Sequence, residues 1–138
     1  MTELTNSAAI TLAAGATAVF DSEFLSQRCN DRTTCSKTGT GVVRMCCGGV
    51  FEIRFTGNIG VSGATGLAQL NIVIDGINYP QGQIFSETTT EGDLNSVERT
   101  FYISNCGCDC ARVALVNTGT TTVTIGIGAI MSVRKVCS

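Results

Sequence analysis

The chain has 138 residues, of which 14 % are charged and 43 % apolar, and its formal net charge is -2. This length corresponds to one domain with a single buried core. The charged fraction is well below the roughly one quarter typical of soluble domains, so apolar patches must remain on the surface. Such patches usually form protein interfaces, and we therefore expect the chain to associate with copies of itself.

Basic residues are scattered and form no stripe, so we expect neither a nucleic-acid partner nor an anionic membrane partner. The sequence has no apolar run of about 18 residues that could span a bilayer. Its first residues also lack the basic region and apolar stretch of a secretory signal. We expect the chain to be made in the cytoplasm.

Eight cysteines conflict with a cytoplasmic destination, because this density is typical of exported proteins held by disulfides. The conflict disappears if the protein leaves its cell by lysis, as a virion or a mature spore does, and oxidises afterwards. All eight are candidates for disulfides: Cys29, Cys35, Cys46, Cys47, Cys106, Cys108, Cys110 and Cys137.

Short runs of Val, Ile, Thr and Phe separated by Gly, Asn and Asp, without a helical period, predict an all-β chain. Residues 1–13 are expected to form an N-terminal arm or first strand, and residues 14–138 the main domain. A further strand is predicted at residues 16–20. Residues 21–40 are polar and turn-rich, which predicts a long loop that a disulfide could tie.

The middle of the chain alternates between apolar and polar residues. Residues 41–45 predict a short strand, and the alternation over residues 51–56 predicts a half-buried one. A strand over residues 70–74 leads into Asp75-Gly76, a pair typical of tight hairpins because both residues accept a positive φ.

Further strands are predicted at residues 83–86, 97–103 and 112–116, and a long last one at 123–133, where apolar residues alternate. About eight to ten strands at this spacing predict an antiparallel two-sheet sandwich of the jelly-roll type.

Several stretches resemble the tumour-necrosis-factor-like jelly roll shared with complement globular heads, most closely its bacterial version on spore-surface collagen-like proteins. The stretches are residues 39–45 (GTGVVRM), 49–55 (GVFEIRF) and 70–76 (LNIVIDG). The ending is similar to clostridial and phage-borne proteins of the same type, at residues 105–108 (NCGC), 113–118 (VALVNT) and 130–136 (IMSVRKV).

The resemblance implies a compact homotrimer, displayed on a larger assembly and without catalytic residues. The chain departs from it by having no Gly-X-Y collagen segment and by having many more cysteines. The implied topology gathers six cysteines at one end of the sandwich: Cys46, Cys47, Cys106, Cys108, Cys110 and Cys137. It leaves Cys29 and Cys35 in a loop based at the other end.

Three interpretations of the six cysteines stay open. They form disulfides within or between subunits, they bind zinc, or they form a redox-active site. Zinc is disfavoured because Cys106-x-Cys108-x-Cys110 lacks the usual Cys-x2-Cys spacing. Redox chemistry is disfavoured because no Cys-x-x-Cys motif is present.

Enzymatic activity is not expected, and no cofactor or metal is predicted. The chain has no histidine, which excludes Ser-His-Asp and Cys-His sites. Glu87, Glu91, Asp93 and Glu98 lie close in sequence but lack the spacing of a calcium loop, so a solvated polar loop is the expected role.

The sequence therefore predicts a self-assembling structural protein of a spore surface or extracellular filament, stabilised by disulfides and in contact with other coat proteins. A phage decoration or head-fibre module is the first alternative, with other virion proteins as partners. A module that binds a receptor or glycan is the second.

Overall fold

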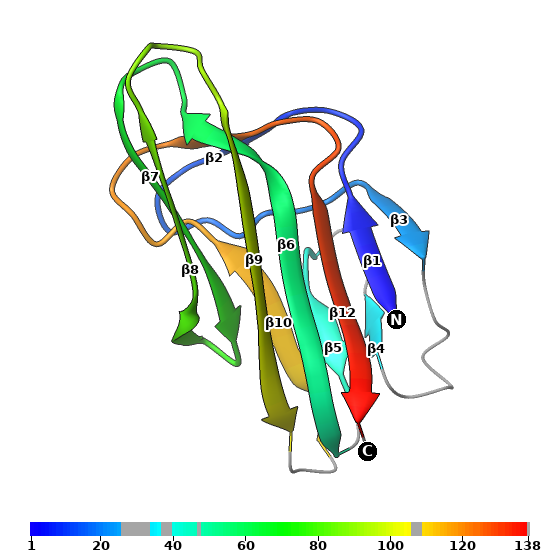
Figure 1. The fold of residues 1–138 in the computed structure, drawn as a ribbon. Coiled ribbons are helices and arrows are strands. Elements are labelled where there is room, and N and C mark those ends of the chain that lie inside the picture. Colours follow the sequence, from blue (N-terminus) through cyan, green and yellow to red (C-terminus); the bar gives the residue numbers. More distant parts are fainter. Residues whose placement is uncertain (26–33, 37–39, 47, 106–108, 138) are drawn as a thin grey trace.

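Strands build almost the whole molecule (Figure 1). The computed structural model describes residues 1–25, 34–36, 40–46, 48–105 and 109–137, and within them it has twelve strands in two antiparallel sheets. The predicted antiparallel two-sheet sandwich is confirmed. The number of strands in these residues exceeds the predicted eight to ten, because short strands form in segments that were expected to be loops.

The seven-stranded sheet is organised around one long strand, β6 (Gly49–Val61). Along one side β6 pairs with β9 (Asn95–Asn105) over eleven residue pairs. Along the other side it pairs with β12 (Ile130–Cys137) and then with β11 (Val123–Ile125). The remaining strands are β1 (Thr2–Thr5), β2 (Ile10–Leu12) and β3 (Ser22–Leu25).

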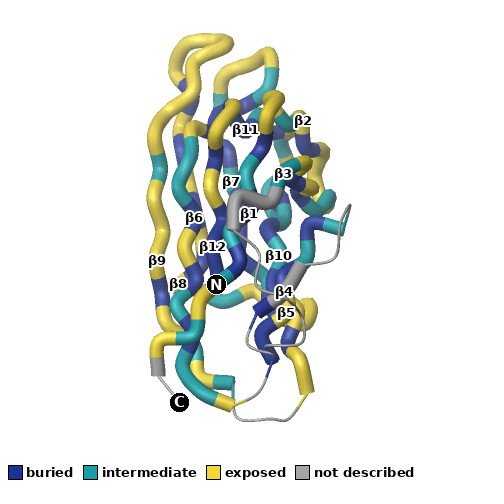
Figure 2. The backbone as a smooth tube through the Cα atoms, turned by 90° about the vertical axis from the view of Figure 1, so that its right-hand side faces the viewer, coloured by how far each residue is buried: buried dark blue, intermediate teal, exposed yellow. Residues whose placement is uncertain are grey.

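The five-stranded sheet has the order β4 (Thr34–Ser36), β5 (Val43–Met45), β10 (Ala111–Val116), β7 (Gly66–Ile74) and β8 (Ile77–Thr88). It faces the first sheet across the core (Figure 2). Strands β8 and β9 therefore form neighbouring edges of the two sheets.

The core fills the space between the sheets with side chains that alternate along the strands. Phe51, Ile53 and Phe55 of β6 are fully buried, as the alternation predicts, and Leu70 and Ile72 of β7 are buried with them. Because apolar side chains project inward from both sheets, the outward-facing residues of each sheet are left for other uses.

Turn chemistry agrees with the sequence at the β7–β8 hairpin. Asp75 has φ 51° and Gly76 has φ 80°, so the predicted tight turn is confirmed. Pro80 follows in β8, at the free edge of its sheet, where its missing N–H breaks no ladder.

The N-terminal residues, for which the sequence left an arm or a first strand open, supply β1 and β2 of the seven-stranded sheet. β1 lies between β12 and β3, and Thr2 is paired with Val133. The structure contains no strand at residues 16–20. Only Thr17 forms an isolated bridge, to Val116, although Ala18 and Phe20 are buried in the core.

The prediction of one continuous loop over residues 21–40 is wrong for the segments that form β3 and β4. These strands lack an apolar alternation. Thr34 is nevertheless fixed at the sheet interior, because it accepts a hydrogen bond of 3.0 Å from the Thr2 hydroxyl. A buried polar residue such as Thr34 does not stand out as apolar, so the period of β4 is not visible in its sequence.

The predicted last strand at residues 123–133 is interrupted between β11 and β12. Gly128 has φ 82°, and the side chain of Asn6 holds the bend. Its amide donates to the Gly126 carbonyl at 2.9 Å, and its oxygen accepts the Ala129 N–H at 2.9 Å. In the segments that the structure describes there is no helix with the length and hydrophobicity needed to cross a bilayer.

Candidate functional site

Cysteines mark one end of the sandwich. Cys46 directly follows β5 and Cys110 directly precedes β10, and the two form a disulfide that spans 64 positions of sequence. Because Met45 and Ala111 are paired in the ladder, the disulfide continues that ladder by one position. Cys46 is buried, whereas Cys110 is exposed.

The same end receives the beginning of β6 and the ends of β9 and β12. Asn105 connects the end of β9 to the end of β5, since its side-chain amide donates to the Met45 carbonyl at 3.2 Å. The backbone of Cys137 pairs with Val50, at the start of β6. Cys46, Cys110 and the Cys137 backbone thus lie at one end, where the implied topology placed them.

The prediction that put Cys35 in a loop at the opposite end is wrong. Cys35 lies in β4, paired with Arg44, next to the pair of Thr34 with Met45. The short polar strand was not recognisable from its sequence. The predictions for Cys29, Cys47, Cys106 and Cys108 fall outside the described residues.

A second feature is the outward face of the seven-stranded sheet over β6, β9 and β12. We call it the outer patch, and its residues alternate with buried core residues on β6 and flank the buried Phe101 on β9. The members are Glu52, Arg54, Glu98, Thr100, Tyr102, Ile130 and Arg134.

Charges in the outer patch are paired within it. The Arg134 guanidinium donates two hydrogen bonds of 3.1 Å to Glu52, one to each carboxylate oxygen. The Tyr102 hydroxyl donates to Glu52 at 3.0 Å, and Arg54 forms an ion pair of 3.1 Å with Glu98. Two acidic and two basic side chains therefore compensate one another across three strands.

The contacts among Glu52, Tyr102 and Arg134 shift the pKa of each of these three groups. The hydrogen bonds from Arg134 lower the pKa of Glu52 most, partial burial opposes them, and the single hydrogen bond from Tyr102 lowers it further. The hydrogen bond to Glu52 raises the pKa of Tyr102 and that of Arg134. The pKa shifts of Glu52 and Arg134 both favour the charged form of that pair.

A third feature is the seam between the two edge strands β8 and β9. Arg99 of β9 donates from Nε to the Gln81 carbonyl at 2.6 Å, and Asn95 donates to the Glu87 carbonyl at 2.9 Å. Between these two contacts lies an open pocket of about 290 Å³ lined by Gln83, Ile84, Phe85, Val97, Glu98 and Arg99. Phe85 is 49 % exposed beside it.

The acidic residues considered for metal binding do not gather into a site. Glu87, Glu91, Asp93 and Glu98 are all exposed, and Glu98 is engaged with Arg54. No group of three or more potential ligands occurs in the part of the chain that the structure covers.

Sequence reasoning missed the outer patch. The alternation of polar residues along residues 51–56 placed Glu52 and Arg54 on one face, but their partners Arg134 and Glu98 lie 82 and 44 positions away. Only the register of β6 with β9 and β12 brings the four together.

Solved structures share this fold over nearly the whole chain. Eiger TNF from S. frugiperda superimposes with a TM-score of 0.62 at 13 % identity, covering 98 % of this chain and 90 % of that one. The globular domain of zebrafish complement 1qA gives 0.58 at 9 % identity, covering 98 % and 95 %. Murine APRIL gives 0.55 at 10 % identity, covering 95 % and 97 %.

No family model matches the sequence, and no curated protein matches it either. The likeness to solved structures therefore rests on shape at low identity. The conclusion is that the chain adopts the jelly-roll sandwich found in tumour necrosis factors and complement globular domains.

Proposed function

We propose that this chain is a non-enzymatic structural module that assembles with copies of itself through the outer patch. The observation that carries the proposal is the internal pairing of Glu52 with Arg134 and of Arg54 with Glu98. Burying an uncompensated charge in an interface costs several kcal/mol, whereas this patch contains two matched pairs. It can be covered without isolating any of these charges.

The patch also carries the side chains that make contacts. Tyr102 is 61 % exposed and Ile130 is 37 % exposed. Tyrosine is enriched among the residues that dominate binding energy at interfaces. The low charge content of the chain supports the same function, because the rest of the surface supplies little electrostatic repulsion between copies.

Stoichiometry is part of the proposal. The tumour-necrosis-factor-like resemblance implies a homotrimer, and the shared fold over 98 % of the chain supports using that resemblance. Disulfides such as Cys46–Cys110 suit an oxidising environment outside the cell. We place the assembly on a spore surface or an extracellular filament, reached by lysis.

Sedimentation equilibrium of the purified chain tests the assembly. The wild-type chain is expected to sediment at three times its 14.4 kDa mass. Thr100→Arg puts a further cation opposite Arg54 in the centre of the outer patch and should weaken association at least about tenfold. Asn78→Arg makes the same charge change at an exposed position of β8 and should leave the trimer intact.

Circular dichroism of both variants establishes that they are folded. A wild-type chain that stays monomeric at micromolar concentration, or a Thr100→Arg chain that assembles as well as Asn78→Arg, contradicts the proposed interface. Electron microscopy with non-reducing gels tests the filament: long polymers that resist detergent until reduced support it. Discrete particles that do not respond to reductant rule out cross-linked filaments.

A further inference from the structure

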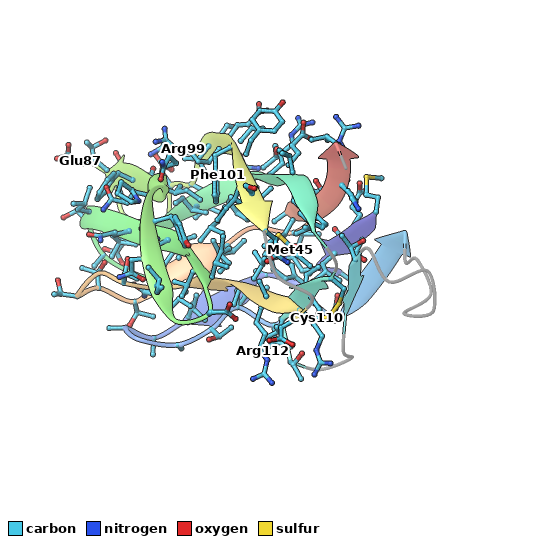
Figure 3. All side chains as sticks on the ribbon, turned by 90° about the horizontal axis from the view of Figure 1, so that it is seen from below. Met45, Glu87, Arg99, Phe101, Cys110 and Arg112 are labelled. Atoms are coloured by element: carbon cyan, nitrogen blue, oxygen red, sulfur yellow. A yellow bond between two sulfur atoms is a disulfide. The ribbon has the colours of Figure 1, made fainter. Side chains whose placement is uncertain are left out.

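Two arginines face each other on the outward side of the five-stranded sheet. Arg44 of β5 and Arg112 of β10 are directly opposite in the antiparallel ladder. Their neighbours Val43, Met45 and Val113 are buried, so the alternation along both strands turns the two arginines outward. Figure 3 shows Arg112 extending away from the ribbon beside Cys110.

This pairing is unfavourable by itself. Side chains directly opposite on neighbouring strands have Cβ atoms about 4.5–5.5 Å apart, and like charges at such positions destabilise a sheet. The other three arginines of the described strands have partners: Arg54 and Arg134 bind carboxylates, and Arg99 binds a carbonyl.

Arg44 and Arg112 have no such compensation from the described residues. No carboxylate oxygen there lies within 4.0 Å of either guanidinium. Asp75 is adjacent in the hairpin turn, but its Oδ1 accepts the backbone N–H of Arg112 at 2.9 Å. Two opposed cations are thus held in place by the ladder, and within the described residues neither guanidinium has a carboxylate in contact.

The arginines line a pocket of about 190 Å³ together with Thr40 and Val42. We call it the arginine pocket. Its wall is fixed, because the Thr40 hydroxyl oxygen accepts the Val42 N–H at 3.3 Å and Gly41 between them packs on the Ala18 carbonyl. The pocket is smaller than the roughly 300–1,000 Å³ of drug-sized ligand sites, so it has the size of an anionic group and not of a whole large ligand.

We propose that the arginine pocket binds a phosphate or sulfate group, either free or as a monoester of a sugar. A guanidinium presents a planar fork of donors that matches an oxyanion in a bidentate manner. A tetrahedral group has enough oxygens to accept from two forks at once, whereas one carboxylate is used up by a single fork. Such a ligand also cancels the repulsion between Arg44 and Arg112.

This site is independent of the proposed self-assembly. The arginine pocket lies on the five-stranded sheet, and the outer patch lies on the seven-stranded sheet, so the two surfaces face in opposite directions. A trimer formed through the outer patch would present three arginine pockets on its outside, which suits the display of a ligand-binding site on an assembly.

Isothermal titration of the oxidised full chain with inorganic phosphate, at constant ionic strength set by sodium chloride, tests the site. Saturable binding is expected in the wild-type chain. Arg44→Gln and Arg112→Gln should each weaken it at least about tenfold, because each removes a pair of charge-assisted hydrogen bonds. Arg99→Gln removes the same charge from β9 of the other sheet, outside the outer patch, and should change the Kd by less than about twofold.

Thermal melting gives a readout that does not depend on heat of binding. Phosphate should raise the Tm of the wild-type chain by mass action and should not raise that of Arg44→Gln. In the absence of phosphate, Arg44→Gln should melt no lower than the wild type, since the repulsion is gone. Equal phosphate binding by the wild type and by both glutamine variants would falsify the proposal. The absence of saturable phosphate binding by the wild type in this buffer would overturn it as well.

Three sugar probes identify the anionic group. Glucose 6-phosphate and galactose 6-sulfate should both compete with inorganic phosphate at the arginine pocket. Glucuronate, which carries a single carboxylate, should compete at least about tenfold more weakly. Glucuronate competing as well as the two esters overturns the assignment to a tetrahedral anion.

Discussion

Glu52 shows how one residue can organise a surface on this fold. Its carboxylate accepts three hydrogen bonds, two from Arg134 and one from Tyr102. Its side chain is only 14 % exposed although it stands on the outward face of the sheet. Arg134 and Tyr102 therefore cover the carboxylate, and the network links the central strand β6 to both of its neighbours.

The lowered pKa of Glu52 makes stability depend on pH in a defined direction. The folded chain binds this proton less readily than the unfolded chain, where the value is near 4.5. The contribution is therefore complete above pH 4.5 and is lost as the pH falls through the lower folded value. Glu52→Gln should reduce the free energy of unfolding at pH 7 by about 1 kcal/mol, since solvent screens the exposed arginine.

Urea unfolding of both chains at pH 7 and at pH 3 measures this difference. The gap between wild type and variant should narrow at the lower pH, because the lowered pKa of Glu52 makes part of its contribution disappear as the pH falls. Glu98→Gln is the matched control, because its ion pair with Arg54 is exposed on both sides and contributes at most about 0.5 kcal/mol. A gap that is the same at both pH values shows that Glu52 acts through packing and not through its charge.

For single residues, the sequence predicts whether a side chain points into the core or outward, but not which residue it contacts. The alternation over residues 51–56 correctly separated inward Phe51, Ile53 and Phe55 from outward Glu52 and Arg54. The choice of partner depends on a register between strands far apart in the chain, which no local pattern encodes. The pairing of Cys46 with Cys110 is undetermined by sequence for the same reason.

Among the elements, the entry into β5 depends on one glycine. Gly41 has φ 69°, a conformation that other residues adopt at a cost of about 1–2 kcal/mol. A Cβ there would also collide with the Ala18 carbonyl, so the two backbones are in direct contact. This contact fixes the segment that carries Val42 and leads into the strand of Arg44.

Gly41→Ala is expected to lower the free energy of unfolding by more than about 3 kcal/mol, since backbone strain and a backbone collision add. Gly15→Ala is the control, because Gly15 has φ 82° but open space around it, and its cost should stay near 1 kcal/mol. Chemical denaturation measures both. Equal losses in the two variants contradict the close contact with Ala18.

The β5 and β10 strands are further joined by the Cys46–Cys110 disulfide. Closing a loop across 64 positions stabilises the folded state by about 4 kcal/mol in the chain-entropy account. The double variant Cys46→Ala, Cys110→Ala should lose an amount of this order in oxidising buffer.

Peptide mapping under non-reducing conditions is the necessary companion measurement. It should recover the peptides of Cys46 and Cys110 joined in the wild type, and it monitors the remaining cysteines in the double variant. Recovery of Cys46 joined to another cysteine, or an unchanged free energy of unfolding, contradicts the disulfide.

Strand positions were predictable where core packing imposes an alternation of apolar and polar residues. They were not predictable where a strand begins or ends because of a polar contact. The hairpin at Asp75-Gly76 follows from turn chemistry alone. The break between β11 and β12 depends on Asn6, which lies more than a hundred positions away in sequence. β4 depends on a hydrogen bond between Thr2 and Thr34.

On the scale of the whole molecule, the two outward sheet faces differ in how they treat charge. The outer patch compensates its charges internally, whereas the five-stranded sheet leaves Arg44 and Arg112 opposed. The fold class and the shortage of charge were predictable from composition and alternation. The division of roles between the faces was not, because it depends on which strands become neighbours.

Cys46, Cys110 and the backbone of Cys137 lie at one end of the sandwich, and this restricts the geometry of any assembly cross-linked there. A bond from that end to the same end of another copy is a self-complementary contact, and such a contact closes after two copies. A chain of subunits with a head and a tail needs a second, different contact. The outer patch cannot supply that contact, because it is already buried in the proposed closed trimer. A filament of trimers would therefore grow through another surface of the sandwich.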